Sequence, residues 1–400
     1  MSHIDDYREV VPKGTVDFLK RLAEQVKGRK ILHVNSTKLG GGVAEMLRSH
    51  IPLLHDVGID AEWHTISGTE EFFNVTKSFH NALQGQDQRL SQQMLQEYLE
   101  VNQENARRLS FAADYVVIHD PQPAALIKSR PTHGKWVWRC HIDVSRPQWK
   151  VWGFLKQFVV NYNAAIFSLP RFAQRLPIPQ FLIYPAIDPL SDKNRDLSDQ
   201  EQTQILSRLN IPMDKPILLQ VSRFDRFKDP LGVVQTYRLV KKRHDVQLIL
   251  AGGEATDDPE GKTVLSEVRE AAREDPDIHI LLLPPDANLE INALQRTATI
   301  VLQKSLREGF GLTVAEAMWK GKPVIGSSAG GITLQIVYGV TGFTVNSVEG
   351  AAFRIHHLLD NPEVMTKIGE NGKEYVRQNF LITRKVGDWL ALMSYLGRAN

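Results

Sequence analysis

The chain has few of the features that mark secreted or membrane proteins. It contains one cysteine, Cys140, among 400 residues, so no disulfide can form within it and a reducing compartment is expected. It has no apolar run near the roughly 20 residues needed to cross a bilayer, so we expect no membrane partner. The polar, acidic start MSHIDDYREVVPKG is unlike a signal or transit peptide, which predicts a cytoplasmic protein.

The chain also lacks a strong net charge. Lys plus Arg number 48 and Asp plus Glu number 46, which gives a formal charge of +2 and argues against nucleic acid as a partner. The histidines, cysteine and acidic residues do not follow the spacing of a bound metal. We therefore expect neither a permanently bound cofactor nor an essential divalent cation.

Length and patterning predict two α/β domains. Four hundred residues exceed one ordinary core, and short apolar runs alternate with amphipathic stretches, as in parallel sheets with crossover helices. Strands are expected at 30–35, 115–118, 136–138, 164–167, 216–221, 246–251, 278–283, 299–302 and 323–325. Helices are expected at about 43–58, 230–243 and 384–395, with one or two long helices between 81 and 109.

A proline-bracketed segment, Tyr184 to Pro189, is the expected linker between the domains. We expect a first domain over 1–187, a second over 188–382, and a last helix over 383–400 that crosses back to the first domain. Both domains should be Rossmann-like and doubly wound, facing across a cleft. Such folds bind ligands at the carboxyl ends of their strands.

The segment Arg307 to Glu316 carries the most specific chemistry. Glu308 and Glu316 flank a Gly-x-Gly turn that leads into a helix. Glycine lets the backbone approach a ligand, and a helix amino terminus suits a phosphate. Carboxylates accept hydrogen bonds from sugar hydroxyls, so the segment predicts a nucleotide-sugar site. For Glu316 an alternative stays open, because Thr313-x-x-Glu316 also fits a capping box.

Two cations, Arg223 and Lys228, follow the strand expected at 216–221. At the carboxyl end of a central strand they could neutralise a diphosphate through charge-assisted hydrogen bonds. The alternative is a solvated loop in which they pair with Asp225 and Asp229.

The first half offers weaker candidates. A glycine run, 40–42, separates the first strand from a helix like a phosphate loop, although it matches neither common phosphate-loop motif. His141 and Asp143 follow the strand at 136–138, so they should lie at its carboxyl tip. A histidine there can donate to a sugar hydroxyl or support developing positive charge, or it can be purely structural. We expect Trp136 and Trp138 to pack in the core.

Together these residues resemble the retaining glycosyltransferases of family four, which have the GT-B fold. The resemblance covers nearly the whole chain. Within that family, residues 38–47, 138–143 and 308–321 are similar to those of the trehalose glycosyltransferring synthases, which join nucleotide-activated glucose to free glucose. The resemblance implies a retaining glucosyltransferase that takes UDP- or ADP-glucose as co-substrate and forms α,α-trehalose. It also implies that the reaction can run in reverse. One departure is residues 303–306, where many relatives have a proline before the serine.

The resemblance also implies a role for each site residue. Glu316 would hold the ribose hydroxyls, Glu308 the donor glucose, and Arg223 with Lys228 the diphosphate. Backbone amides would face the donor from Gly309, Phe310, Gly311, Leu312 and Thr313, with Leu283 near the base. In the first domain, His141 and Asp143 would contact sugar, and Gly41 and Gly42 would lie where diphosphate and acceptor meet.

Other functions stay open on the sequence. A trehalose phosphorylase would share the cation pair, and another family-four transferase would use a different small acceptor. A nucleotide-sugar 2-epimerase should lack the paired glutamates, and a non-catalytic sugar- or nucleotide-binding protein would bind without turnover. The choice between UDP and ADP and the presence of a homodimer also stay open.

Overall fold

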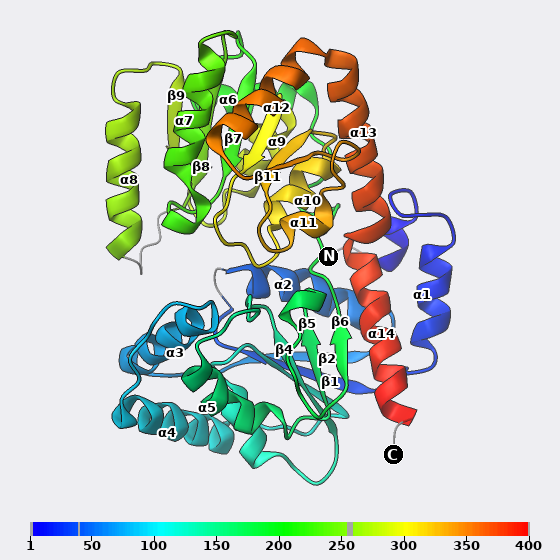
Figure 1. Ribbon diagram of the computed structural model, residues 1–400. Helices are drawn as coiled ribbons and strands as arrows, with labels where there is room; N and C mark the ends of the chain where they lie inside the picture. The colour runs from blue at the N-terminus through cyan, green and yellow to red at the C-terminus, as the bar shows by residue number, and fades with distance from the viewer. Residues whose placement is uncertain (1–2, 39–40, 254–258, 399–400) are drawn as a thin grey trace. The chain divides into compact units, whose positions relative to one another are not determined.

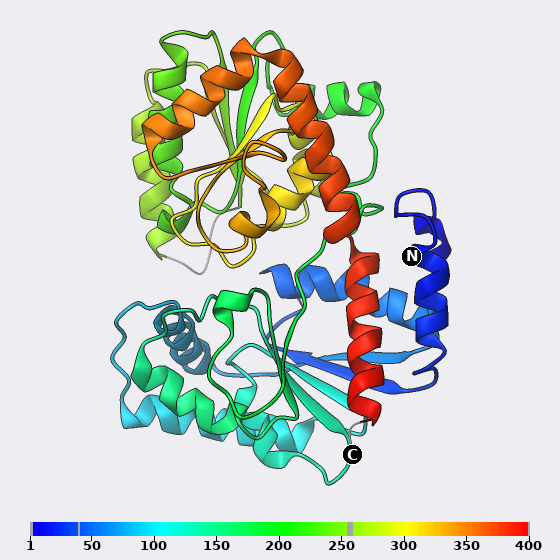
Figure 2. The ribbon, with the colours of Figure 1, turned by 45° about the vertical axis from the view of Figure 1, so that its right-hand side comes forward.

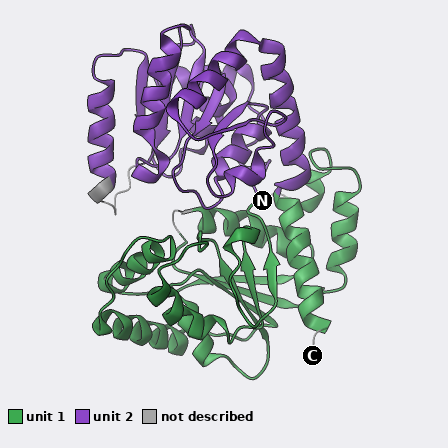
Figure 3. Ribbon diagram, viewed as in Figure 1, with its two compact units in different colours: residues 1–185, 382–400 green, residues 186–381 purple. Residues whose placement is uncertain are grey.

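A computed structural model describes residues 3–38, 41–253 and 259–398. The chain forms two compact units, residues 1–185 with 382–400 and residues 186–381 (Figure 3). Each unit is built on one six-stranded parallel sheet. This confirms the predicted class of two parallel-sheet α/β domains.

The sheet of the first unit has the strand order β2-β1-β3-β4-β5-β6. The direction of the order reverses between β1 and β3, which are neighbours in the sheet. Such a reversal is where doubly wound folds bind their ligands. The strands are β1 (Lys30–Asn35), β2 (Asp60–Thr65), β3 (Tyr115–His119), β4 (Lys135–Cys140), β5 (Ala164–Phe167) and β6 (Gln180–Leu182).

The helices of this unit form two groups. One group contains α1 (Thr15–Ala23), α2 (Gly41–Asp56) and α14 (Ile382–Arg398), in which α14 packs beside α1 and α2. Both views of the ribbon show α1 and α14 side by side, although they come from opposite ends of the chain (Figures 1 and 2). The other group contains α3 (Glu70–Leu83), α4 (Gln92–Arg108), α5 (Trp149–Val159) and η2 (Ala124–Ser129). Two short helices, η1 (Ile4–Tyr7) and η3 (Pro170–Phe172), complete the unit.

The sheet of the second unit has the order β12-β11-β10-β7-β8-β9. Here the order reverses between β7 and β10, which pair in the centre. The strands are β7 (Ile217–Val221), β8 (Gln247–Gly252), β9 (Ile278–Leu282), β10 (Ile300–Gln303), β11 (Val324–Ser327) and β12 (Phe343–Val345). The helices are α6 (Asp199–Arg208), η4 (Arg226–Lys228), α7 (Pro230–Lys241), α8 (Pro259–Ala272), α9 (Asn288–Thr297), α10 (Leu312–Trp319), α11 (Ile332–Gln335), α12 (Val348–Asp360) and α13 (Pro362–Asn379).

One long helix, α4, lies within the segment 81–109, as predicted, whereas α3 lies mostly before that segment. The hydroxyl of Thr69 caps the start of α3 through the N–H of Phe72, and α3 ends at Leu83. A second cap, Ser91 on the N–H of Met94, starts α4. Each cap satisfies a backbone donor that the helix itself cannot, so the two helices start independently. In the described part of the chain, no helix has both the length and the apolar character needed to cross a membrane.

Candidate active site

Two loops meet at the point where the strand order of the second sheet reverses. The loop after β7 runs from 222 to 229, and the loop after β10 runs from 304 to 311. The N–H of Leu306 donates to the carbonyl of Phe227 at 2.7 Å, and the guanidinium of Arg307 lies 5.8 Å from the Phe227 ring centroid. Residues 79 and 80 positions apart in sequence are thereby held side by side at the carboxyl ends of the two central strands.

Lys228 and Glu308 form the central ion pair of this site. The Lys228 ammonium lies 2.7 Å from Oε2 of Glu308, and the side chains are 19% and 10% exposed. The same Oε2 accepts from the Ser305 hydroxyl at 3.1 Å and from the Gln303 amide at 3.3 Å. The other oxygen, Oε1, has no partner among the described residues. One oxygen therefore anchors the carboxylate, while the other remains available to a hydroxyl donor.

The second predicted cation, Arg223, is 62% exposed and lies 3.2 Å from Asp225. The alternative of a solvated loop is thus partly right for Arg223. It is wrong for Lys228, since Asp229 pairs with Lys304 instead. The backbone N–H of Lys228 donates to the Asp225 carboxylate at 3.2 Å, while its side chain pairs with Glu308.

The glycine turn holds five backbone donors free. Gly311 has φ +82°, a conformation that favours glycine, and α10 begins directly after it. The carbonyls of Gly309 and Phe310 accept from Gly331 at 3.0 Å and Gln335 at 2.7 Å. The N–H groups of 309–313 donate to no residue that the structure describes. Free N–H groups at a helix start form a ready site for an anion.

Glu316 is not a capping residue, so that alternative is wrong. The start of α10 has no side-chain cap, and the Thr313 hydroxyl donates to Gln303 at 3.0 Å. Glu316 is only 2% exposed and contacts the Gln295 amide at 3.3 Å and the Lys193 ammonium at 3.8 Å. Its carboxylate therefore lies in a cationic neighbourhood beneath the glycine turn.

Lys320, one turn after Glu316, adds to that neighbourhood. Its ammonium donates to Asn194 at 2.9 Å and to the Glu316 carbonyl at 3.2 Å. Burial lowers the pKa of Lys320 to about 7, although the Glu316 carboxylate opposes that shift. Leu283 follows β9, where it is buried and donates its N–H to Gly252 at 2.9 Å. The carboxyl ends of β8 and β9 thus meet at Leu283.

Sequence reasoning missed a second glycine pair, Gly330 and Gly331, that supports the turn. A Cβ on Gly330 would lie 1.5 Å from the Glu308 carbonyl oxygen, and one on Gly331 would lie 2.6 Å from Phe310. Only glycine permits this approach, and it fixes the backbone that carries Glu308. The available signal was the Ala329-Gly330-Gly331 run, which begins four residues after the strand expected at 323–325.

We expect Gly330→Ala to disrupt the site, because the new methyl group must displace the backbone of Glu308. A shift of about 1 Å at a catalytic group can cost about 10²-fold in rate. Gly339→Ala is the matched control: Gly339 also has positive φ, at +73°, but nothing lies within 4 Å of its Cβ position. Both variants carry the left-handed cost of about 1–2 kcal/mol. Turnover and melting temperature of both should be measured, and equal turnover would contradict the clamp.

In the first unit, His141 lies directly after β4, as expected. Its N–H donates to the Asp120 carboxylate at 2.7 Å, and its ring Nε2 lies 2.9 Å from Nδ1 of His119. Burial, followed by the Arg139 guanidinium, lowers the pKa of His141 well below its usual value. The imidazole is therefore neutral at neutral pH. Asp143 instead closes a local turn by accepting from the Ser145 N–H at 3.0 Å.

Asp120, which accepts from the backbone N–H of His141, is a neighbour of the candidate site that sequence reasoning missed. It has φ +64°, an uncommon backbone conformation for a residue with a side chain, at the carboxyl end of β3. Burial raises the pKa of its carboxyl group to about 7, against the opposing effect of the His141 N–H. The available signal was the triplet His119-Asp120-Pro121 after the strand at 115–118.

The remaining predictions for the first unit have mixed outcomes. Gly41 and Gly42 form the start of α2, whereas Gly40 lies outside the described residues. Trp136 and Trp138 are fully buried, which confirms core packing.

Over residues 3–38, 41–253 and 259–398, no group of three or more His, Cys, Asp or Glu side chains is arranged to hold a metal ion.

Comparisons with known proteins identify the chain as a glycosyltransferase. Residues 33–174 match the trehalose synthase N-terminal domain family, and residues 201–375 match glycosyl transferases group 1. The chain is 47% identical to the trehalose synthase of Pyrococcus horikoshii over 98% of this chain and 96% of the other. It belongs to the trehalose synthase family of glycosyltransferases.

The chain is also similar, at lower identity, to proteins that are named for other activities. A trehalose phosphorylase from Pleurotus pulmonarius is 29% identical over all of this chain and 62% of its own length. Among solved structures, the sucrose-phosphate synthase of Thermosynechococcus elongatus has a TM-score of 0.73 at 18% identity, covering 93% of this chain and 100% of the other. That likeness shows the shared GT-B fold.

Proposed function

We propose that the protein transfers glucose from a nucleotide-glucose, UDP- or ADP-glucose, to the anomeric hydroxyl of a second glucose, forming α,α-trehalose with retention. One observation carries the proposal. The Lys228–Glu308 pair and the five free N–H groups of 309–313 occur in the same two loops. This combination offers cation and amide donors for phosphate and a carboxylate for sugar hydroxyls.

The donor half of the reaction is assigned to the second unit. Cleavage of the bond between the anomeric carbon and phosphate builds oxocarbenium character on the sugar and negative charge on the leaving diphosphate. Lys228 and Arg223 would stabilise that charge together with the N–H groups of 309–313. These groups are already oriented by Asp225 and by the Gly330–Gly331 contact, so little reorganisation accompanies the reaction.

Recognition of the nucleoside is assigned to Glu316 and Leu283. The buried Glu316 carboxylate, which lies 3.8 Å from the Lys193 ammonium, would accept from the ribose hydroxyls. The buried position of Leu283 at the end of β9 suits an apolar contact with the base. The geometry alone is compatible with either UDP or ADP.

The sugar reacting centre is assigned to His141 in the first unit. A neutral imidazole can donate to or accept from a hydroxyl without adding positive charge next to the oxocarbenium centre. The acceptor would attack from the face of the leaving group, and a phosphate oxygen would take its proton. No side-chain nucleophile takes part. We further propose a cytoplasmic enzyme that needs no bound cofactor and acts on small sugars, in which a homodimer is open to test.

A donor-by-acceptor activity screen tests the function. UDP-glucose and ADP-glucose are each incubated with glucose, fructose, glycerol phosphate and glycerate, and the product linkage is identified by NMR. We expect α,α-trehalose from glucose and no product from the other acceptors. Formation of a different glycoside would overturn the proposed acceptor.

A second arm separates the phosphorylase alternative, which the relative from Pleurotus pulmonarius keeps under consideration. Trehalose is incubated with inorganic phosphate and, separately, with UDP or ADP. Nucleotide-glucose formed only with the nucleotide supports the proposal, whereas glucose 1-phosphate formed with phosphate replaces it by phosphorolysis.

A further inference from the structure

Three histidines of the first unit, His33 in β1, His119 in β3 and His141 directly after β4, form a hydrogen-bonded chain that ends at His141. Nδ1 of His33 lies 3.0 Å from Nε2 of His119, and Nδ1 of His119 lies 2.9 Å from Nε2 of His141. The ring centroids are 5.2 Å apart in both pairs, and the rings are tilted by 31° and 17°. The two hydrogen bonds therefore link the three rings in sequence.

Strand register explains how the chain arises. β1, β3 and β4 are parallel neighbours, and His33 pairs laterally with Val117, two residues before His119. His119 in turn pairs with Arg139, two residues before His141. Side chains two residues apart share one face of a strand, so each histidine lies on the same face and one step nearer the carboxyl edge. The chain of hydrogen bonds therefore runs from the interior of the sheet toward its carboxyl edge, where His141 lies.

The chain is enclosed on that face. His33 and His119 are 0% and 3% exposed. The Trp389 ring of α14 contacts His33 edge-on at 5.3 Å, and His50 of α2 lies 5.8 Å from His33. Burial lowers the pKa of His33 to about 3 and that of His119 well below its usual value, with Lys385 acting in the same direction. All three rings are neutral near pH 7.

Neutral rings impose a strict relation along the chain. Each neutral imidazole carries one N–H, so its two nitrogens are one donor and one acceptor. With two hydrogen bonds in series, the protons must all sit on the side toward His141 or all on the side toward His33. The outer nitrogens, Nε2 of His33 and Nδ1 of His141, have no partner in the described part of the chain. The state of Nδ1 on His141 is therefore coupled to His33, two strands away.

We propose that His119 and His33 are positioning residues for His141, holding its ring in one tautomer and one orientation during glucosyl transfer. This inference rests on the proposed function, in which His141 contacts the donor sugar near the reacting carbon. Neither His119 nor His33 needs to touch substrate. Their effect reaches the reaction through Nδ1 of His141, the nitrogen that does not face His119, which one tautomer makes a donor and the other an acceptor.

Substitutions at His119 can separate a hydrogen bond from bulk. Asparagine places its amide at the position of Nδ1, which faces His141, whereas glutamine places it at the position of Nε2, which faces His33. Leucine removes both bonds. We expect His119→Asn to keep most of the turnover, and His119→Gln and His119→Leu to lose about tenfold or more in kcat with little change in KM for the donor. Melting temperatures identify any variant that is merely unfolded.

A spectroscopic measurement reads the chain without any turnover. In protein labelled with ¹⁵N in the histidine rings, the His141 signal is assigned from its loss in His141→Gln. We expect one tautomer of His141 in the wild type and in His119→Asn, and a tautomer mixture in His119→Leu. This result is independent of substrate, so absence of trehalose synthesis would reject the proposed function without deciding the role of His119.

Two outcomes would overturn the inference. One is wild-type kcat in His119→Leu together with an unchanged His141 spectrum, which would mean that the neighbouring imidazole does not position His141. The other is an equal loss of kcat in His119→Asn and His119→Gln, since the loss would then follow ring volume rather than the bond to His141.

Discussion

Replacing Lys228 with alanine should lower kcat for glucosyl transfer by about 10²-fold or more, the usual cost of removing one pre-oriented charge from a developing anion. The ammonium is held 2.7 Å from Glu308 and is only 19% exposed, so water cannot replace it without reorganisation. Lys228→Met should be almost as damaging, because it keeps the length of the side chain and removes only the charge. Steady-state kinetics with saturating donor measures the effect.

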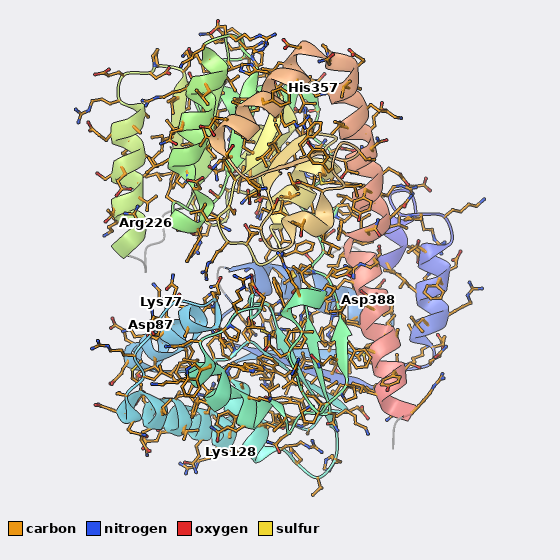
Figure 4. The ribbon with its side chains drawn as sticks, viewed as in Figure 1. Lys77, Asp87, Lys128, Arg226, His357 and Asp388 are labelled. Carbon is orange, nitrogen blue, oxygen red and sulfur yellow. The ribbon has the colours of Figure 1, made fainter. Side chains whose placement is uncertain are left out.

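Arg226 provides the matched control for Lys228. It lies two residues earlier in η4, and its guanidinium reaches α8, where it lies 2.9 Å from Glu267 (Figure 4). Arg226→Ala removes the same charge from the same short helix and should leave kcat within a few-fold of wild type. If Arg226→Ala and Lys228→Met were equally impaired, the effect would reflect net charge and the assigned donor site would be wrong.

A double-mutant cycle adds a geometric test. Lys228 and Glu308 share a hydrogen bond, and residues in direct contact give non-additive effects. Glu308→Gln with Lys228→Met should therefore be little worse than the poorer single variant. Additive losses would show that the two side chains act in separate steps.

The donor loops were predictable because their signals are local. Arg223, Lys228 and Glu308 follow apolar runs that form central strands, and in a doubly wound sheet the carboxyl ends of such strands bind ligands. The positive φ of Gly311 follows from the glycine itself. Such a motif can be recognised from neighbouring residues alone, without knowledge of the order of the strands in the sheet.

The partners of those motifs could not be predicted, because they depend on register and on distant segments. Lys193 approaches Glu316 from 123 positions earlier in the chain, since the segment before α6 packs on α9 and α10. The contact between His33 and His119 spans 86 positions. A one-residue slip of β3 would turn His119 to the other face, and no sequence pattern fixes that register.

The missed strands are β2, β6 and β12, and each lies at a sheet edge. β2 and β6 are largely not buried, and β12 is only three residues long. Strands with one open side carry polar residues, so their apolar run is interrupted. β9 was found because its sequence, IHILL, remains apolar. The break between α3 and α4 was signalled by Gly85, which has φ +86°, and by Ser91, but helical composition on both sides obscured it.

Acidification from pH 6.5 to 5 should destabilise the first unit sharply. His33, His50, His119 and His141 have pKa values lowered by burial, with Lys385 or Arg139 acting in the same direction. Below pH 6.5 the unfolded chain binds protons that the folded chain does not. Each histidine therefore lowers the free energy of unfolding by about 1.4 kcal/mol for each unit by which the pH is lowered. Asp120, whose pKa burial raises to about 7, and Asp388, whose pKa burial also raises, oppose part of this loss.

His50→Leu isolates one of these contributions. The His50 ring is fully buried, neither of its nitrogens has a partner among the described residues, and it is not a member of the hydrogen-bonded chain. Its removal should reduce the pH dependence of the unfolding free energy by about 1.4 kcal/mol per pH unit between pH 6.5 and 5. Urea titrations of wild type and variant at several pH values measure both slopes. Leucine keeps the site filled and removes the protonatable group. Equal slopes of unfolding free energy against pH in the two proteins would therefore mean that His50 is protonated in the folded protein as readily as in the unfolded chain.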